Sequence, residues 1–366
     1  MKLTAGKQEL LEKLSDIQNI VEKRNTMPVL SHFLLEAGKE EAHIMATDLE
    51  TAIREPLALT ADNEGRLCIP ARKLFEIVRE VEGDIVIESD DPQWIRVRAG
   101  ASNFRLACLS PEDFPAWPSM EQADEFEMNS SELSEMIEKT IYSAGESDTR
   151  YTLNGLLLHI TPDNKSFTVV GTDGHRLAVI TKEAPSALKE EKKVILPRKA
   201  ASELRKFLDK DGKVSVLIGK NHILFKVGAV EFLSRLIEGT YPNYMQVIPP
   251  ANEKKLTIDR ESFIRALRRV SIMSRDRSNA VKADIANGVL TFTSSNPDLG
   301  EATDEIAIDY GGEAVTIGFN ARYLLDALGA IPTEKVVFEI QDQLSPTLLR
   351  KDDSGDYRCV IMPMRI

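Results

Sequence analysis

The segment GTDGHRLAVI, residues 171–180, brings together side chains that can do chemistry. Asp173, His175 and Arg176 supply a carboxylate, an imidazole and a guanidinium, a combination that serves acid–base or phosphoryl-transfer chemistry in enzymes. Asp173 followed by Gly174 is also a strong turn signal. The segment alone therefore leaves open both an active site and a structural turn.

The rest of the sequence carries none of the motifs that would complete an active site. There is no P-loop, no GxGxxG, no HExxH and no GxSxG. No second histidine, cysteine or carboxylate stands at metal-ligand spacing from His175. We therefore predict no catalytic residue, no metal site and no cofactor. The absence of a CxxC pair and the odd number of cysteines predict buried, reduced thiols at Cys68, Cys108 and Cys359.

An earlier segment, ATDLETAI at residues 46–53, matches 171–180, with Asp48 and Asp173 lying 125 positions apart. Of the three chemically active side chains only the carboxylate recurs. This favours a structural role for Asp173, in which the carboxylate accepts backbone N–H bonds across a turn. His175 and the arginine after it stay candidates for function, although a lone histidine is more often structural.

The turn belongs to a repeat that runs through the whole chain. Amphipathic helices are predicted in three related segments, which begin at Lys2, Phe126 and Lys255. A second helix recurs in segments that begin at Ile69, Leu196 and Gly318. Alternating strands follow, and related closing segments begin at Phe104, Phe232 and Tyr357. The sequence therefore predicts an α+β fold of three tandem domains, each with two helices and antiparallel sheets, at residues 1–122, 123–251 and 252–366.

Composition and charge limit the class of protein. With 366 residues and 42% hydrophobic side chains, the chain can form two or three domains with buried cores. No apolar run approaches the roughly 20 residues of a membrane helix, and no signal peptide is evident, so we expect a cytoplasmic protein without a membrane partner. The net charge of −12 argues against coating nucleic acid with the whole surface. Two basic runs, 197–213 and 260–277, leave room for a local basic face, although solvated helix faces would look the same.

Four features together carry a resemblance to a known family: the three tandem domains, TDGHRLA at 172–178, EGTYPNY at 238–244 and the ending MPMR at 362–365. Over its whole length the chain resembles the bacterial DNA polymerase III beta subunit, the sliding clamp. The resemblance implies a DNA-replication protein that is not an enzyme and is associated with the nucleoid. In that family a head-to-tail homodimer forms a ring of six similar domains, which encircles duplex DNA and acts as a polymerase processivity factor.

The resemblance also implies a pocket between the second and third domains that receives short peptide motifs of DNA polymerases, the clamp loader and repair proteins. Leu, Val and Met would form an adaptable apolar floor, and His175, Arg176 and Arg365 would anchor polar groups at the rim. The matching positions are Leu153, Thr172, Gly174, His175, Arg176, Leu177, Pro242, Val247, Asn320, Tyr323, Val360, Met362, Pro363, Met364 and Arg365. Alternation near the C-terminus predicts a final strand with Val360, Met362 and Met364 on one face.

A ring that slides must hold DNA by its phosphates without reading bases, which calls for diffuse Lys and Arg on an inner wall of helices. Together with the basic runs, the resemblance implies sequence-independent contacts to duplex DNA from Arg24, Arg72, Arg150, Tyr151, Arg198, Lys199, Arg265, Arg268 and Arg269. Thr152, Gln246 and Pro346 differ from the residues that other clamps carry at these positions. Base stacking at Thr152 therefore stays open, as does the effect of Gln246 and Pro346 on which peptides bind most tightly.

Head-to-tail closure needs two different, complementary faces. By resemblance, the first-domain face uses Lys73, Phe104, Arg105 and Leu106, and the third-domain face uses Ile272, Met273, Glu301, Asp304 and Glu305. Ile272 and Met273 would be unusual on the surface of a monomer, although they would also fit the core of an amphipathic helix.

Two other classes of protein stay open on the sequence alone. One is an enzyme, such as a phosphodiesterase, that uses Asp173 and His175. The other is a monomeric scaffold that binds proteins but not DNA.

Overall fold

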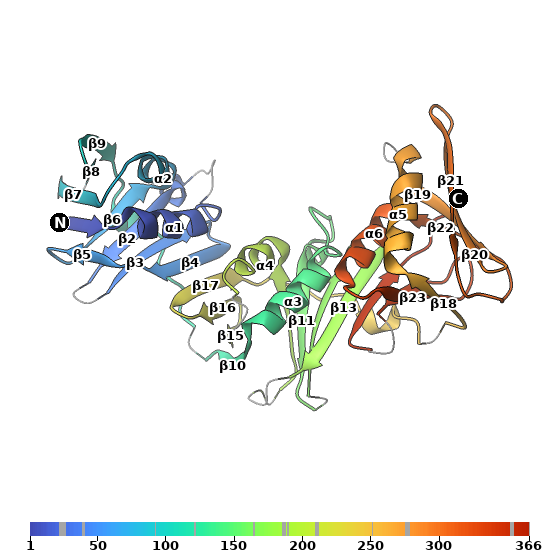
Figure 1. Ribbon diagram of the computed structural model, residues 1–366. Helices are drawn as coiled ribbons and strands as arrows, with labels where there is room; N and C mark the ends of the chain where they lie inside the picture. Colours follow the sequence, from blue (N-terminus) through green and yellow to red (C-terminus); the bar gives the residue numbers. More distant parts are fainter. Residues whose placement is uncertain are drawn as a thin grey trace. The chain divides into compact units, whose positions relative to one another are not determined.

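The computed structural model (Figure 1) describes residues 1–21, 27–38, 41–91, 93–120, 122–163, 165–184, 188, 190–208, 212–250, 252–274, 279–351 and 355–365. The chain divides into two compact units. The first unit comprises Met1–Leu133 and Ser202–Leu236, and the second comprises Ser134–Ala201 and Ile237–Ile366. Helices and antiparallel sheets occur in both units, so the predicted α+β class is confirmed.

The first unit contains two sheets, with the strand orders β5–β1–β7–β8–β9 and β10–β15–β16–β17–β4–β3–β2–β6. Its strands are β1 (Lys2–Ala5), β2 (His32–Ala37), β3 (Ala42–Thr47), β4 (Thr51–Pro56), β5 (Leu59–Ala61), β6 (Gly65–Pro70), β7 (Ile85–Asp91), β8 (Trp94–Ala99), β9 (Ser102–Ala107), β10 (Asp124–Asn129), β15 (Lys213–Ile218), β16 (His222–Val227) and β17 (Val230–Arg235). Its described residues also form two helices that pack on each other and two short 3-10 turns: α1 (Lys7–Ile17), α2 (Ala71–Glu80), η1 (Pro28–Ser31) and η2 (Pro111–Asp113).

The second unit also contains two sheets, with the orders β14–β11–β12–β13–β25–β24–β23–β18 and β21–β20–β19–β22. Its strands are β11 (Gly155–Thr161), β12 (Ser166–Thr172), β13 (Arg176–Glu183), β14 (Lys192–Pro197), β18 (Lys254–Asp259), β19 (Ala280–Ala286), β20 (Val289–Asn296), β21 (Gly300–Ala307), β22 (Val315–Asn320), β23 (Lys335–Ile340), β24 (Thr347–Arg350) and β25 (Tyr357–Ile361). Its helical segments are α5 (Arg260–Val270), α6 (Ala321–Ala330), η3 (Tyr151–Leu153), η4 (Tyr244–Gln246) and η5 (Ser271–Met273). Two further helices, α3 (Ser130–Ile141) and α4 (Arg198–Leu204), have residues in both units.

Each eight-stranded sheet joins strands from two neighbouring copies of the predicted repeat. In the first unit β4 pairs with β17, with Ala52 opposite Leu233. In the second unit β13 pairs with β25, with Leu177 opposite Val360. The segments that carry the two matching turns therefore occupy equivalent places in the two sheets. The division into domains after residues 122 and 251 stays a prediction, and Ala251 lies outside the described residues.

Helix α5 shows how the sequence sets the local fold. The Asp259 carboxylate caps its first turn by accepting the backbone N–H of Ser262 at 2.8 Å. Phe263 and Leu267, four residues apart, lie on its fully buried face. Arg265 and the other arginines of the helix after Arg260 lie on its exposed face. Helical periodicity therefore separates an apolar stripe, which packs into the core, from a basic stripe, which faces solvent.

The three cysteines are free and buried, as predicted. Burial raises the pKa of the Cys68 thiol to about 12 and that of Cys108 to about 11. Among the helices of the described residues, none is long and apolar enough to cross a membrane.

Candidate functional site

The turn that links β12 to β13 is held by the side chains of Thr172 and Asp173. The Thr172 hydroxyl accepts the Gly174 N–H at 3.0 Å and donates to the Arg176 carbonyl at 2.6 Å. The Asp173 Oδ1 atom accepts the N–H groups of His175 at 2.9 Å and Arg176 at 3.1 Å. Gly174 has a φ of +84°, which glycine adopts without strain. The predicted structural role of Asp173 is therefore confirmed.

The Arg176 guanidinium is almost fully engaged with neighbouring groups of the second unit. It donates to Asp173 Oδ2 at 3.0 Å, to Asp326 Oδ2 at 2.6 Å and to the Tyr142 carbonyl at 2.6 Å. Its carbon Cζ also lies 4.5 Å from the centre of the Tyr323 ring. Burial by itself lowers the pKa of Arg176, but the two carboxylates outweigh it and raise the pKa above its ordinary value. Arg176 therefore stays positive and fixes the position of the turn.

This geometry gives Asp173 and His175 no arrangement for acid–base chemistry. Both oxygens of Asp173 already accept hydrogen bonds, Oδ1 from two backbone N–H groups and Oδ2 from the Arg176 guanidinium. His175 is exposed, and its backbone rather than its ring contacts Asp173. In the described residues there is no cluster of three or more His, Cys, Asp or Glu side chains that could hold a metal ion.

A pocket opens beside the turn, and we call it the Arg176 pocket. It encloses about 530 Å³ of space that is partly open to solvent. Its lining residues are Arg150, Leu153, Thr172, Gly174, Arg176, Leu177, Pro242, Tyr244, Val247, Val360 and Met362. Leu177, Val360 and Tyr244 belong to one buried apolar cluster, which forms the floor. Nine of these eleven residues are among the fifteen that the sequence assigns to a peptide pocket.

The other six predicted residues do not line the pocket. They are His175, Asn320, Tyr323, Pro363, Met364 and Arg365. Tyr323 contacts the Arg176 side chain, and the Asn320 side chain caps α6 by accepting the Arg322 N–H at 2.9 Å. Met364 donates its N–H to the Gly318 carbonyl at 2.8 Å. These three residues therefore lie behind or beside the pocket wall.

The C-terminal segment differs from the predicted strand. The predicted final strand is present as β25, and Val360 and Met362 both line the Arg176 pocket, but β25 ends at Ile361, so the extension of the strand face to Met364 is wrong. The backbone instead continues across the turn, where the Met362 N–H donates to the His175 carbonyl at 2.9 Å. Pro363 has no N–H to donate, which prevents the regular ladder from continuing.

Two lining residues, Arg150 and Tyr244, are not among the predicted pocket residues. Arg150 is a predicted DNA contact, but its guanidinium forms a two-point ion pair with Asp148, at 3.0 and 2.8 Å, and donates to the Asp173 carbonyl at 2.9 Å. The Tyr244 hydroxyl lies 2.8 Å from Nδ1 of the buried His159, whose Nε2 lies 2.7 Å from Glu191. The repeat of DFPAWP as TYPNYM is the sequence signal that marks Tyr244 as part of the wall.

The remaining predicted DNA contacts lie at or near the surface wherever the structure describes them. Arg72, Tyr151, Lys199, Arg265, Arg268 and Arg269 are exposed, and Arg198 is half-buried. Arg72 forms an ion pair with Glu76 at 2.9 Å, Arg198 with Glu146 at 3.3 Å, and Arg269 with Asp304. Arg24 lies outside the described residues.

The residues predicted for a dimer interface lie on two edge strands and the segments near them. β9 is an edge strand of the five-stranded sheet and carries Phe104, Arg105 and Leu106, of which Arg105 is exposed. β21 is an edge strand of the four-stranded sheet and carries Glu301, Asp304 and Glu305. Ile272 in η5 is 57% exposed and Met273 half-buried, so the core alternative for Ile272 is wrong. Lys73 lies on α2, paired with Glu76 at 2.8 Å.

Comparison with known proteins covers the whole chain. Residues 1–118, 127–243 and 245–365 match the N-terminal, central and C-terminal domains of the DNA polymerase III beta subunit. Beta sliding clamps of Caulobacter vibrioides and Pseudomonas putida are each 36% identical to the chain over the full length of both proteins.

Solved structures agree with the sequence matches. The beta subunit structure from Pseudomonas aeruginosa is 34% identical to the chain, with a TM-score of 0.95 over all of both chains. A Caulobacter crescentus beta sliding clamp, with polyethylene glycol bound to a putative beta-motif tethering region, is 36% identical over both full chains, with a TM-score of 0.94. The chain therefore belongs to the family of the DNA polymerase III beta subunit, the beta sliding clamps, which are DNA polymerase processivity factors.

Proposed function

We propose that this chain works without catalysis, as a homodimeric ring that encircles duplex DNA in the cytoplasm, at the nucleoid, and holds DNA polymerases, a clamp loader and repair proteins through the Arg176 pocket. One observation carries the proposal: the turn Thr172–Arg176 is fixed by its own side chains and by Asp326, and it forms the wall of an apolar pocket. The cluster therefore holds a binding surface in place and leaves no free base.

The pocket has the chemistry of a peptide site. Leu177, Val360 and Met362 offer apolar surface for one or two buried side chains, and methionine adapts its shape to different ligands. Arg150 adds an exposed guanidinium at the side of the pocket, where it can donate to peptide carbonyls or to an acidic residue. We infer that an extended segment with apolar anchors, and with neutral or acidic polar groups, is the natural ligand.

Dimer closure is supported by the character of the two edge strands. An unpaired strand edge offers backbone N–H and C=O groups to another chain. β21 carries the exposed acids Glu301 and Glu305, whereas β9 carries Arg105 beside half-buried Phe104 and Leu106. Opposite charges on two different edges favour a head-to-tail contact over a contact between identical edges.

The basic stripe of α5 supports binding to DNA by its phosphates. Arg265 and Arg268 are exposed on a protein whose net charge is −12, so cations are concentrated where a polyanion would lie. Guanidinium groups on a helix face bind phosphates without reading bases, which suits movement along any sequence.

The test is a peptide titration on a chain that lacks residues 362–366. We expect fluorescence polarisation to show no binding of polymerase or loader peptides, because Met362 lines the pocket and its N–H closes onto the turn. Size measurement should still give a dimer, since the two edge strands are untouched. Native affinity in the shortened chain would move the peptide site elsewhere, and monomers would make the tail an interface element.

A further inference from the structure

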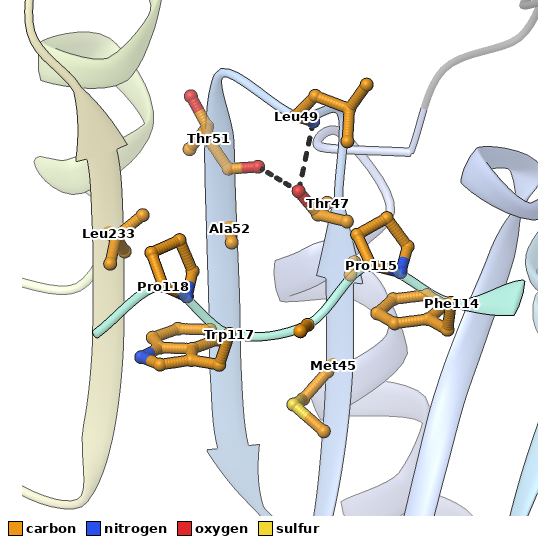
Figure 2. Close-up of a pocket in the computed structure, with 12 residues that line it drawn as sticks. Met45, Thr47, Leu49, Thr51, Ala52, Phe114, Pro115, Trp117, Pro118 and Leu233 are labelled. Carbon is orange, nitrogen blue, oxygen red and sulfur yellow. Dashed lines mark hydrogen bonds between the residues drawn. The ribbon is translucent and has the colours of Figure 1, made fainter. Parts of the chain in front are cut away.

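A second pocket, in the first unit, is built in the same way as the Arg176 pocket. We call it the Trp117 pocket, and Figure 2 shows how segment 114–118 crosses in front of β3, β4 and β17 to form it. It encloses about 450 Å³ of partly open space, against about 530 Å³ for the Arg176 pocket. Its lining residues are Met45, Ala46, Thr47, Leu49, Thr51, Ala52, Phe114, Pro115, Ala116, Trp117, Pro118 and Leu233.

The wall of the Trp117 pocket is the matching turn, Thr47–Thr51. The Thr47 hydroxyl accepts the Leu49 N–H at 3.0 Å and donates to the Thr51 carbonyl at 2.9 Å, as Figure 2 shows. The Asp48 Oδ1 atom accepts the N–H groups of Glu50 at 3.1 Å and Thr51 at 2.6 Å. These four hydrogen bonds repeat, position for position, those of Thr172–Arg176. The two turns therefore share one pattern of hydrogen bonds between side chains and backbone.

The floor and the cover also correspond. Trp117 packs against Ala52 and Leu233, which are paired across β4 and β17. In the second unit Tyr244 packs against Leu177 and Val360, which are paired across β13 and β25. Each aromatic ring follows a proline by two positions in a segment that crosses its sheet, at 114–118 or at 241–245.

One residue of the wall is held in an unfavourable backbone conformation. Leu49 has a φ of +75°, and its counterpart Gly174 has a φ of +84°. A side chain with a Cβ atom is disfavoured in this region, so leucine here is strained whereas glycine is not. The Leu49 side chain is nevertheless 49% exposed and lies at the mouth of the pocket. A strained, exposed leucine does nothing for the core, and such outliers concentrate where a surface contacts a ligand.

The two pockets differ in charge. The arginines of the second unit are replaced by Thr51, which takes the place of Arg176 in the turn, and by Met27, which takes the place of Arg150. Met27 is matched to Arg150 because its carbonyl accepts the N–H three residues on, as that of Arg150 does. No charged residue is among the twelve that line the Trp117 pocket. The Asp48 carboxylate of the wall accepts the N–H groups of Glu50 and Thr51. Glu50 forms an ion pair with Arg235 at 3.7 Å.

We propose that the Trp117 pocket is a second docking site, which takes an uncharged, apolar peptide segment of a partner protein. The class of ligand follows from the function proposed for the Arg176 pocket, since wall, floor and cover are shared. The preference for uncharged segments follows from the lack of an arginine among the twelve lining residues and from exposed Leu49, which is 49% accessible. An acidic segment would lose its cationic partner here.

The test uses methyl NMR spectra of the full chain labelled with carbon-13 at the methionine methyl groups. Met45 lines the Trp117 pocket and Met362 lines the Arg176 pocket, so one spectrum reports on both. The neutral peptide acetyl-Leu-Leu-Phe-amide should shift the Met45 signal to saturation. The acidic counterpart acetyl-Asp-Leu-Phe-amide should bind less tightly than the neutral peptide at the Trp117 pocket, as read at Met45. At the Arg176 pocket, as read at Met362, the acidic peptide should lose no affinity.

Matched variants assign each response to its pocket. Ala116 is exposed at the Trp117 pocket, and Ala116→Glu should weaken the Met45 response about tenfold or more while the Met362 response persists. Val247 is 37% exposed at the Arg176 pocket, and Val247→Glu should do the reverse. Leu49→Gly should weaken the Met45 response about three- to tenfold without lowering the melting temperature, because the strain is relieved.

Three results would overturn the proposal. A Met45 signal that stays still at millimolar neutral peptide shows that the pocket takes no such segment. A Met45 shift that survives Ala116→Glu shows that the peptide binds elsewhere, and equal affinity for both peptides at Met45 contradicts the charge preference. If the function proposed for the Arg176 pocket is wrong, neither peptide will shift the Met362 signal. That result is distinct from a failure of the Trp117 pocket, which is read at Met45.

Discussion

Arg176 connects several parts of the candidate site. Its guanidinium joins the turn to Asp326 on α6, to the Tyr142 carbonyl and to the Tyr323 ring. The sequence predicts Arg176 as a polar anchor at the rim, since the residue stands in the TDGHRLA segment. Its ion pair with Asp326, 150 positions later, could not be predicted. The sequence pattern places each residue on its own element, but it does not show which of the many carboxylates lies beside the arginine in the folded chain.

We therefore predict that Arg176→Ala lowers the free energy of unfolding by about 2–4 kcal/mol, because Asp173 and Asp326 lose a largely buried partner. His175→Ala, at the exposed neighbouring position, should change it by less than about 0.5 kcal/mol. Urea denaturation of both variants measures the difference. Equal effects of the two substitutions would mean that the arginine is a surface residue in solution.

The pair of Asp148 and Arg150 sets a pH dependence. Hydrogen bonds from the Arg150 side chain, and then from its backbone N–H, lower the pKa of Asp148 from 3.8 to about 2. Since the folded-state pKa is depressed, the pair stabilises the folded chain fully above the ordinary pKa of 3.8, and this contribution is lost as the pH falls through about 2. Carboxyl carbon NMR should show Asp148 titrating near 2. Titration near 3.8 would show that Arg150 does not hold the carboxylate.

At the scale of elements, helices with a clear apolar period were the most predictable part of the fold. α5 begins at Arg260, directly after its capping residue Asp259, and its buried residues Phe263 and Leu267 follow at helical spacing. Strand ends were less predictable, because pairing depends on partners far along the chain. Pro363 was visible in the sequence and signals the end of β25, but the alternation of apolar residues around it suggested a longer strand.

Helix α5 also carries a prediction for DNA binding. Arg265→Glu with Arg268→Glu should weaken binding of the full chain to duplex DNA, because two cations no longer neutralise phosphates. Binding should also depend less on salt: the slope of the logarithm of the binding constant against the logarithm of the salt concentration should become shallower by about 1 to 2. The effect should be the same for every DNA sequence. A matched charge change at exposed positions on strands outside the two basic runs, Lys193→Glu with Lys255→Glu, should have a smaller effect. A filter-binding salt series on two unrelated duplexes separates these results, and altered sequence preference would contradict sliding.

At the scale of the whole molecule, the sequence identifies three tandem copies because their helices, turns and closing segments recur at similar spacing. The assembly of chains is harder to predict from the sequence. An interface needs two surfaces that fit each other, and the periodicity of a sequence does not show that fit. Ile272 shows the difference: the sequence leaves it between core and interface, and its 57% exposure leaves an apolar side chain without cover.

We predict that Ile272→Ala with Leu106→Ala converts the proposed homodimer to monomers at nanomolar concentration, since losing two large apolar side chains costs an interface several kcal/mol. Sedimentation velocity measures the change, and a melting curve checks that each chain still folds. As a control, Leu344→Ala removes an exposed leucine that lies outside the proposed interface, and it should leave the dimer intact. An intact dimer of the double variant would refute the assignment of the two faces.

The central claim is that the chain holds DNA by enclosing it. The most direct measurement loads the chain onto a nicked circular DNA with a clamp loader and ATP, isolates the complex at a salt concentration that screens phosphate contacts, and then cuts half of the sample with a restriction enzyme. A closed ring stays on the circle and slips off the cut, linear form. If the chain leaves both forms at the same rate, or stays equally on both, it does not enclose DNA.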